Sequence, residues 1–389
     1  MAAAPPLRRH RPSCVNRSSS SLQSIQALRG FAALYVVAFH SGLALAHADI
    51  PALAWLTTHV IKRGHVGVDV FFVISGFIIA WVAILGPKGP ETPSAFLVKR
   101  TFRLAPPYWL MSVLHSTWLH PVSAGALLSS LAFLPQANMD APYFGYPALY
   151  VGWSLNYEAF FYALCALGLA LFGRRALWLV ALVLFTTTII VPFWHGSVVL
   201  RDPEALYAWA TPVQAMAANP LVLEFLQGAG LAWLYAEHRH RLTPAVARVL
   251  LAVGLGAFII SVIGPVPKFD LLARGLPAGA LLMGLVAMEY CSLLRVPRVA
   301  VWLGELSYAL YLAHPSVIEA THRLVGVLAP EWIGTQLLLF AVNLALTLAL
   351  AALLHRYVEQ PFIALGRKTI DWMHDTRHAW RARLGLQKP

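Results

Sequence analysis

Apolar residues gather along this chain in ten long runs separated by short polar stretches. A helix of about 20 apolar residues crosses the hydrocarbon core of a bilayer, and each run approaches or exceeds that length. In lipid the backbone must satisfy its own hydrogen bonds, so each run is expected to be a helix. The pattern therefore predicts an all-α polytopic membrane protein, a bundle of about ten transmembrane helices at residues 25–46, 65–86, 101–119, 153–173, 176–194, 220–236, 245–264, 271–294, 299–325 and 334–355.

Lys and Arg residues are distributed unevenly between the two ends of these runs. If the N-terminus is cytoplasmic, 23 of the 29 fall in loops and helix ends on the inner side. Cytoplasmic loops of membrane proteins carry such an excess of positive charge, so both termini are predicted to be cytoplasmic. Topology thus accounts for the net charge of +12, and we expect no nucleic-acid partner. The six residues on or near the outer side are Lys62, Arg63, Arg201, Lys268, Arg274 and Arg323.

Composition agrees with this class, because only 12% of the residues are charged, against about 25% in soluble domains. Residues 1–24 are basic and rich in Ser and Pro, and we expect a disordered cytoplasmic tail. Residues 25–365 form the membrane domain, in which 122–134 is too short to span and is predicted to be interfacial or re-entrant. Residues 366–389 form a basic, amphipathic cytoplasmic tail, predicted to lie on the anionic inner leaflet.

Two ionisable residues interrupt the first apolar run, "LRGFAALYVVAFH" at residues 28–40. Eleven helical steps of about 100° bring His40 to within roughly 20° of Arg29, about 16 Å further along the axis. Arg29 could simply reach the inner headgroups, and His40 could bond a neighbouring helix. Because ionisable side chains are costly inside a membrane, we favour a functional role, above all for His40.

Charged residues also stand near the ends of the second and third runs. Lys99, Arg100 and Arg103 lie together where the third run begins on the inner side. Topology alone explains such a cluster without any ligand, and the functional alternative is a clamp for a phosphorylated cytosolic donor. Asp69 lies just inside the outer boundary of the second run. It could orient an imidazole, hold a substrate hydroxyl or bond the local backbone.

The fourth run opens with "GWSLNYEAFFY". Glu158 lies about one helical turn inside it, and the residues beside it are Trp153, Ser154, Tyr157 and Tyr162. A carboxylate at this position is near the outer face, at about the depth of His40. An intramembrane carboxylate with polar neighbours is a candidate for a functional site.

The ninth run contains a stripe of polar residues within "GELSYALYLAH". Ser307, Tyr311 and His314 recur on one helical face, and Tyr308 follows Ser307. Singly, such residues often make helix-packing hydrogen bonds. Three facing a bundle that already holds His40 and a membrane carboxylate indicate a site. No metal site is expected, since no pair of His, Asp or Glu residues three or four apart within a helix looks like a site.

These motifs together resemble the acyltransferase-3 family of integral-membrane O-acyltransferases, and most closely its exopolysaccharide acetyltransferase-like branch. They stand in the family's order and cover roughly residues 22–365, so the membrane domain is interpreted as an acyltransferase domain. The matches are Arg29-x10-His40, "GVDVFFVISGF", Arg100-x-x-Arg103 followed by "LAPPYW", "WSLNYEAFFY", "SYALYLAH" and "EQPF" at residues 359–362, which is read as a helix end.

The resemblance implies transfer of an acyl group, acetyl in most relatives, from cytosolic acyl-CoA to a sugar hydroxyl. It implies acyl-CoA and a polysaccharide or lipid-linked sugar as partners, no bound cofactor, and a bacterial inner membrane. His40 would be the general base or a transient acyl carrier, assisted by Arg29 and Glu158. The donor would be held by Lys99, Arg100 and Arg103, and the acceptor or the catalytic groups would be supported by Asp69, Ser154, Tyr157, Ser307, Tyr308, Tyr311 and His314.

Two alternatives stay open from the sequence. The acceptor could be a small hydroxylated metabolite such as a macrolide. A proton-coupled transporter would also place buried His and Glu residues among ten helices, although neither an inverted repeat nor paired broken helices are visible in the sequence.

Overall fold

The computed structural model describes residues 22–43, 45, 50–86, 89–136, 141–144, 148–265, 268–326 and 333–383. Within these ranges the regular elements are helices, and none is a strand. The described ranges leave out residues 1–21, which make up most of the predicted N-terminal tail, and residues 384–389. The all-α class predicted from the apolar runs is therefore confirmed for the described part of the chain.

Each predicted apolar run coincides with one or more helices. Three of these helices run on through a π-helical turn, at residues 79–84, 186–190 and 271–275. The helices in the runs are α1 (Gln23–Ser41), α3 (Val66–Ile78), α4 (Pro93–Trp118), α6 (Trp153–Phe172), α7 (Ala176–Phe185), α8 (Val191–Trp194), α10 (Val222–His238), α11 (Pro244–Ile263), α12 (Leu276–Tyr290), α13 (Arg298–Glu305), α14 (Ser307–Gly326) and α15 (Ile333–Leu354). Shorter helices between the runs are α2 (Pro51–His59), α5 (Ala124–Leu131) and α9 (Pro212–Ala218).

Five continuous helical stretches in the described residues are long and apolar enough to cross a membrane. They are Pro51–Ile84, Tyr150–Trp194, Pro244–Ile263, Leu271–Tyr290 and Gly334–Thr376. The chain is thus an integral membrane protein, while the count of ten spanning helices and the cytoplasmic termini stay predictions. The ninth run is not one helix, because the chain turns at Leu306 between α13 and α14.

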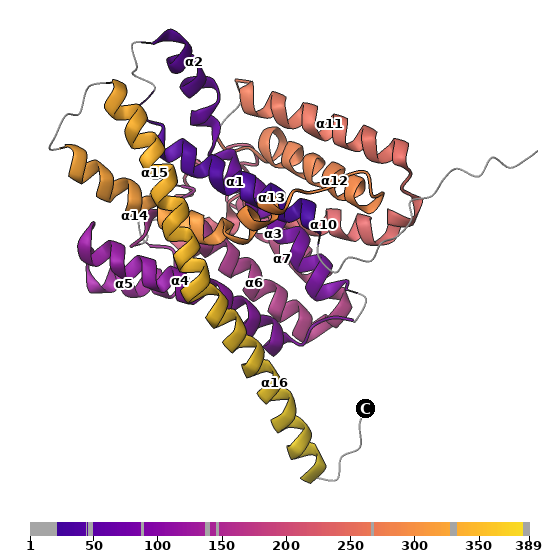
Figure 1. Ribbon diagram of the computed structural model, residues 1–389. Coiled ribbons are helices and arrows are strands. Elements are labelled where there is room, and N and C mark those ends of the chain that lie inside the picture. The colour runs from indigo at the N-terminus through magenta and orange to yellow at the C-terminus, as the bar shows by residue number, and fades with distance from the viewer. Residues whose placement is uncertain are drawn as a thin grey trace, which may run out of the picture.

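Helix α1 lies in the middle of the bundle and packs against α3, α12, α13, α14 and α15, as Figure 1 allows the reader to follow. It contacts α13 closely at Gly30. A Cβ atom at Gly30 would lie 2.8 Å from the backbone nitrogen of Gly304, so only glycine lets the two backbones touch. Because α1 is central, its two ionisable residues face other helices.

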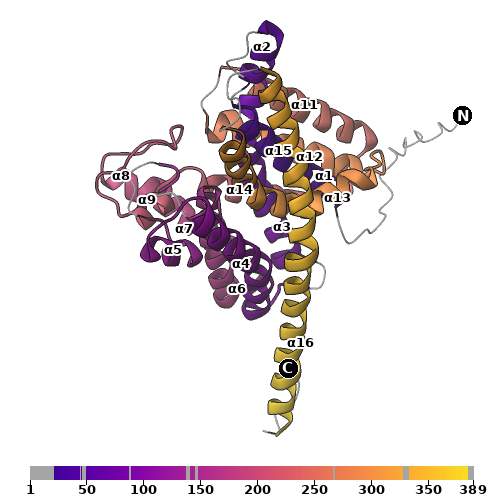
Figure 2. The same cartoon turned by 60° about the vertical axis from the view of Figure 1, so that its left-hand side comes forward.

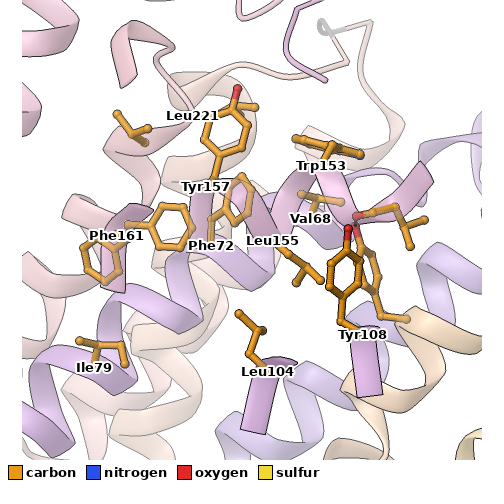
Figure 3. Packing of buried hydrophobic residues seen from close by; sticks show 14 of the residues in the cluster. Val68, Phe72, Ile79, Leu104, Tyr108, Trp153, Leu155, Tyr157, Phe161 and Leu221 are labelled. Carbon is orange, nitrogen blue, oxygen red and sulfur yellow. Dashed lines mark hydrogen bonds between the residues drawn. The ribbon is translucent and has the colours of Figure 1, made fainter. Parts of the chain in front are cut away.

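The aromatic core joins α3, α6 and α10. Phe72 stacks on Phe225 with ring centroids 4.5 Å apart, and Phe161 lies 4.8 Å from the same ring. Figure 3 shows Tyr157 in this group of rings. Its hydroxyl donates a hydrogen bond to the carbonyl oxygen of Pro142 at 2.8 Å, which ties the loop before α6 to the core. This packing holds α3 and α6 at a fixed separation.

Helix α16 (Gln360–Arg383) continues α15 through a π-helical turn at His355–Glu359. Figures 1 and 2 both show it extending out of the bundle in line with α15. The helix end predicted at "EQPF" is therefore wrong. Pro361 is tolerated because it lies at the start of a helical segment, next to a turn whose hydrogen-bond pattern is already shifted. The position of this tail on the inner leaflet stays a prediction.

Candidate active site

A cavity opens between α1, α3, α4, α6 and α14. Its empty volume is about 820 Å³ with the open mouth included. Eight of the residues singled out from the sequence line it together. They are Arg29, Arg100, Arg103, Ser154, Glu158, Ser307, Tyr308 and Tyr311.

The apolar wall of the cavity comes mainly from α3. This helix contributes Val68, Phe71, Phe72, Ile74 and Ile78 to the lining. Phe72 in this row also stacks on Phe225 of α10, so the wall is continuous with the aromatic core. The cavity therefore has an apolar side and a charged side.

Three guanidinium groups and one carboxylate form the charged side. Arg100 lies over the rings of Phe96 and Tyr162, 5.5 and 5.8 Å from their centroids. Its Nε has no hydrogen-bond partner among the described residues. Arg29 has Arg103 and Glu158 as charged neighbours. Positive charge exceeds negative charge in the lining, so the cavity is suited to an anionic ligand.

The carboxylate of Glu158 is held by two hydroxyl groups. Ser75 Oγ on α3 donates to Glu158 Oε1 at 2.7 Å, and the Tyr162 hydroxyl donates to the same oxygen. The sequence analysis placed Tyr162 beside Glu158 but missed Ser75. Ser75 is a polar residue within the apolar run of α3, and Tyr162 stands one helical turn after Glu158, so their positions carried a signal.

The tyrosines of α14 connect this helix to its neighbours at the cavity. The hydroxyl of Tyr308 donates to the carbonyl oxygen of Leu104 on α4 at 2.6 Å. The hydroxyl of Tyr311 lies 2.8 Å from Ser154 Oγ and donates to the carbonyl oxygen of Val151 at 2.9 Å. Tyr311 thereby marks one end of the cavity, next to α6.

His40 lies beyond this end of the cavity and pairs with His314. The centroids of the two imidazole rings are 4.9 Å apart, and the ring of Tyr311 lies 5.8 Å from that of His314. Tyr150 packs 5.6 Å from His40. Neither histidine is among the residues that line the cavity. The polar residues thus form a column from the arginines through Tyr311 to the two imidazoles.

The structure places three predicted site residues away from the cavity. Asp69 is fully buried on α3, where its carboxyl group faces that of Glu224 on α10. Lys99 forms an ion pair with Glu91 at 2.8 Å and is half-exposed. Tyr157 belongs to the aromatic core described above.

Glu359, which the sequence analysis placed at a helix end, lies inside a continuous helix. Its side chain is 2% exposed, in the π-helical turn, and its carboxylate accepts a hydrogen bond from His355 Nδ1 at 2.7 Å. It is a charged neighbour of Arg29. The His–Glu spacing of one helical turn in "HRYVE" is the signal that pointed to this pair.

An all-helical integral membrane protein with a positively charged cavity among its helices is the class that the fold and the site define. The sequence model of the acyltransferase-3 family, described as an acyltransferase domain, matches residues 22–356. The chain belongs to this family and is a membrane acyltransferase, which confirms the resemblance seen in its motifs.

Several characterised proteins are similar to the chain. The exopolysaccharide production protein ExoZ of Rhizobium meliloti is 33% identical over 80% of this chain and 93% of its own length. The acyltransferase MdmB of Streptomyces mycarofaciens is 28% identical over 89% of this chain and 93% of its own length. The peptidoglycan O-acetyltransferase OatA of Listeria monocytogenes is 23% identical over 88% of this chain and 56% of its own length. The comparison with solved structures found no significant match.

Proposed function

We propose that the protein transfers an acyl group, acetyl in the first instance, from cytosolic acyl-CoA to a hydroxyl of an exopolysaccharide or other cell-surface sugar in a bacterial inner membrane. The observation that carries the proposal is the single cavity in which Arg29, Arg100 and Arg103 meet, adjoined by the His40–His314 pair. The acceptor class is supported by similarity to a protein named for exopolysaccharide production.

The charged side of the cavity is suited to hold the donor. Coenzyme A carries phosphate groups, and guanidinium groups bind phosphate through paired hydrogen bonds. Arg100 and Arg103 stand at the cavity wall on α4 and would bind these phosphates. The apolar wall from α3 would hold the pantetheine arm, which points the thioester toward Arg29 and α14.

His40 would act as the general base. Its Nδ1 lies 3.0 Å from the carbonyl oxygen of Val36. A carbonyl oxygen only accepts hydrogen bonds, so Nδ1 carries the proton and Nε2 has the free lone pair. Nε2 takes the proton of the acceptor hydroxyl as the new C–O bond forms. The C–S bond then breaks, and the leaving thiolate recovers the proton from His40 Nε2.

Arg29 and Glu158 would complete the catalytic group. Arg29 lines the cavity and would stabilise the negative charge that develops on the thioester oxygen. Glu158, a charged neighbour of Arg29, would orient that guanidinium. A second route, in which His40 first receives the acyl group covalently and then passes it to the hydroxyl, uses the same residues.

The test is transfer of labelled acetyl from acetyl-CoA in membranes that contain the wild type or His40→Ala. Label should enter the polysaccharide fraction only with the wild type, at equal protein abundance. His115→Ala is the matched control, because His115 is buried, bonds Ser316 on α14 and does not line the cavity. Normal transfer by His40→Ala would refute the assignment of His40 as the general base. Label in a small-metabolite fraction would show that the acceptor is a small metabolite in place of a polysaccharide.

A further inference from the structure

The two adjacent imidazoles on α1 and α14 are held in the same way. His40 Nδ1 bonds the carbonyl oxygen of Val36 at 3.0 Å, and His314 Nδ1 bonds that of Leu310 at 3.2 Å. Each acceptor belongs to the histidine's own helix, four residues earlier. Since both Nδ1 atoms must donate, both neutral rings present Nε2 as a hydrogen-bond acceptor. Two acceptors therefore lie together between the helices.

No donor among the described residues serves His314. Its side chain is fully buried, and its Nε2 has no hydrogen-bond partner in the part of the chain that the structure describes. The hydroxyl of Tyr311, whose ring lies 5.8 Å from that of His314, is engaged with Ser154 and the carbonyl oxygen of Val151. A buried acceptor without a donor is costly and indicates that a ligand supplies one.

His40 provides the accessible half of this pair. Its side chain is partly exposed, and the buried imidazole of His314 packs against it with ring centroids 4.9 Å apart. A ligand that reaches His40 Nε2 with one hydroxyl would need a second hydroxyl next to it to satisfy His314 Nε2. Hydroxyl groups on adjacent ring carbons of a sugar have this arrangement, and each has one proton to donate.

We propose, on the basis of the function proposed above, that the acceptor is a vicinal diol and that His314 is its second binding group. One hydroxyl loses its proton to His40 Nε2 and receives the acyl group. The neighbouring hydroxyl keeps its proton and donates a hydrogen bond to His314 Nε2. A site built to bind a hydroxyl strongly rejects a substrate that lacks it, because its own buried group is left unpaired.

The experiment compares two forms of one acceptor, the surface polysaccharide of a strain that lacks the gene. One portion is oxidised with periodate, which cleaves the bond between two hydroxyl-bearing carbons, and is then reduced with borohydride to isolated primary alcohols. The other portion receives borohydride alone. Both are incubated with labelled acetyl-CoA and membranes containing the wild type, His314→Leu, His314→Gln or the matched control His115→Leu.

The wild type and His115→Leu should label the intact polysaccharide and label the oxidised form at least about tenfold less, the loss expected for an unpaired buried acceptor. His314→Leu should label the intact form at least about tenfold less than the wild type does. His314→Gln should recover part of this loss, because its amide oxygen can accept the hydrogen bond. Coenzyme A binding by the two His314 variants should match the wild type.

The proposal would be overturned if the wild type labelled the two acceptor forms equally. It would also be overturned if His314→Leu labelled the intact form as strongly as the wild type does. Loss of coenzyme A binding by His314→Leu would show that this variant is misfolded, and His314→Gln then decides. The proposal is overturned if His314→Gln labels each of the two acceptor forms as strongly as the wild type does. Absence of label from the wild type with both forms would refute the proposed function itself, and this inference with it.

Discussion

Helix α3 contacts carboxyl groups on two of its sides, and these groups differ in what they can reach. On one side Ser75 holds Glu158, which lines the cavity beside Arg29. On the other side Asp69 faces Glu224, both carboxyl groups are 0% exposed, and neither lines the cavity. A carboxylate inside a membrane segment thus marks a binding site only where a cavity gives a ligand access to it.

The buried pair has the features of a structural cluster. Arg274, also fully buried, is a charged neighbour of Asp69. Groups of this kind stabilise one another against the cost of leaving water, and removing one of them leaves the others uncompensated. We therefore expect substitutions in this cluster to change stability, and substitutions at the cavity to change activity.

The largest effect on stability is expected for Asp69→Ala. It should lower the free energy of unfolding by about 3–5 kcal/mol, because it leaves Arg274 buried without this carboxylate. The measurement is thermal unfolding of the purified protein in detergent, with Glu158→Gln as the control that should unfold like the wild type. An Asp69→Ala protein of wild-type stability but without activity would move Asp69 into the active site.

Next in size is the effect of removing the two cavity arginines of α4. Arg100→Ala combined with Arg103→Ala should raise the apparent KM for acetyl-CoA by roughly ten- to a hundredfold, since hydrogen bonds to charged groups contribute about 1.5–3 kcal/mol. Initial rates over a range of acetyl-CoA concentrations measure this change. The KM for the acceptor should stay within about twofold, and an unchanged KM for acetyl-CoA would remove the arginines from the donor site.

A smaller effect is expected for Ser75→Ala. This change removes one of the two hydroxyl groups that bond Glu158 Oε1. A side-chain hydrogen bond contributes about 0.5–1.5 kcal/mol, so the free energy of unfolding should fall by no more than this, and kcat should fall by roughly two- to tenfold because Glu158 is held less firmly. Ser75→Thr, which keeps the hydroxyl, is the matched control. A loss of stability in place of a loss of rate would assign Ser75 to packing.

The smallest effect is expected for Lys99→Ala. This substitution tests whether Lys99 belongs to the donor site together with Arg100 and Arg103. Lys99 stands next to Arg100 in the chain, but its ammonium group is paired with Glu91 at the surface. Surface ion pairs contribute about 0–1 kcal/mol. The KM for acetyl-CoA should therefore stay within about twofold of the wild type. An increase as large as that of the double arginine variant would extend the donor site to Lys99.

Sequence reasoning was most successful where local chemistry decides the outcome. The ten apolar runs are helical because a backbone in lipid has to satisfy its own hydrogen bonds. The ordered motifs from Arg29 to "EQPF" pointed to the family that the domain match confirms. Eight predicted residues line one cavity, since each was chosen as a polar group on an apolar helix, where burial against another helix is the expected arrangement.

Only the tertiary structure decided which of these polar groups meet. Helical periodicity gives the face on which a residue lies, but the packing of distant segments decides what that face contacts. Gly30 brings α1 against α13, and the bend at Leu306 then directs α14 so that His314 lies beside His40. For the same reason Glu158 reaches a cavity while Asp69 meets Glu224, although both are single carboxylates within apolar runs.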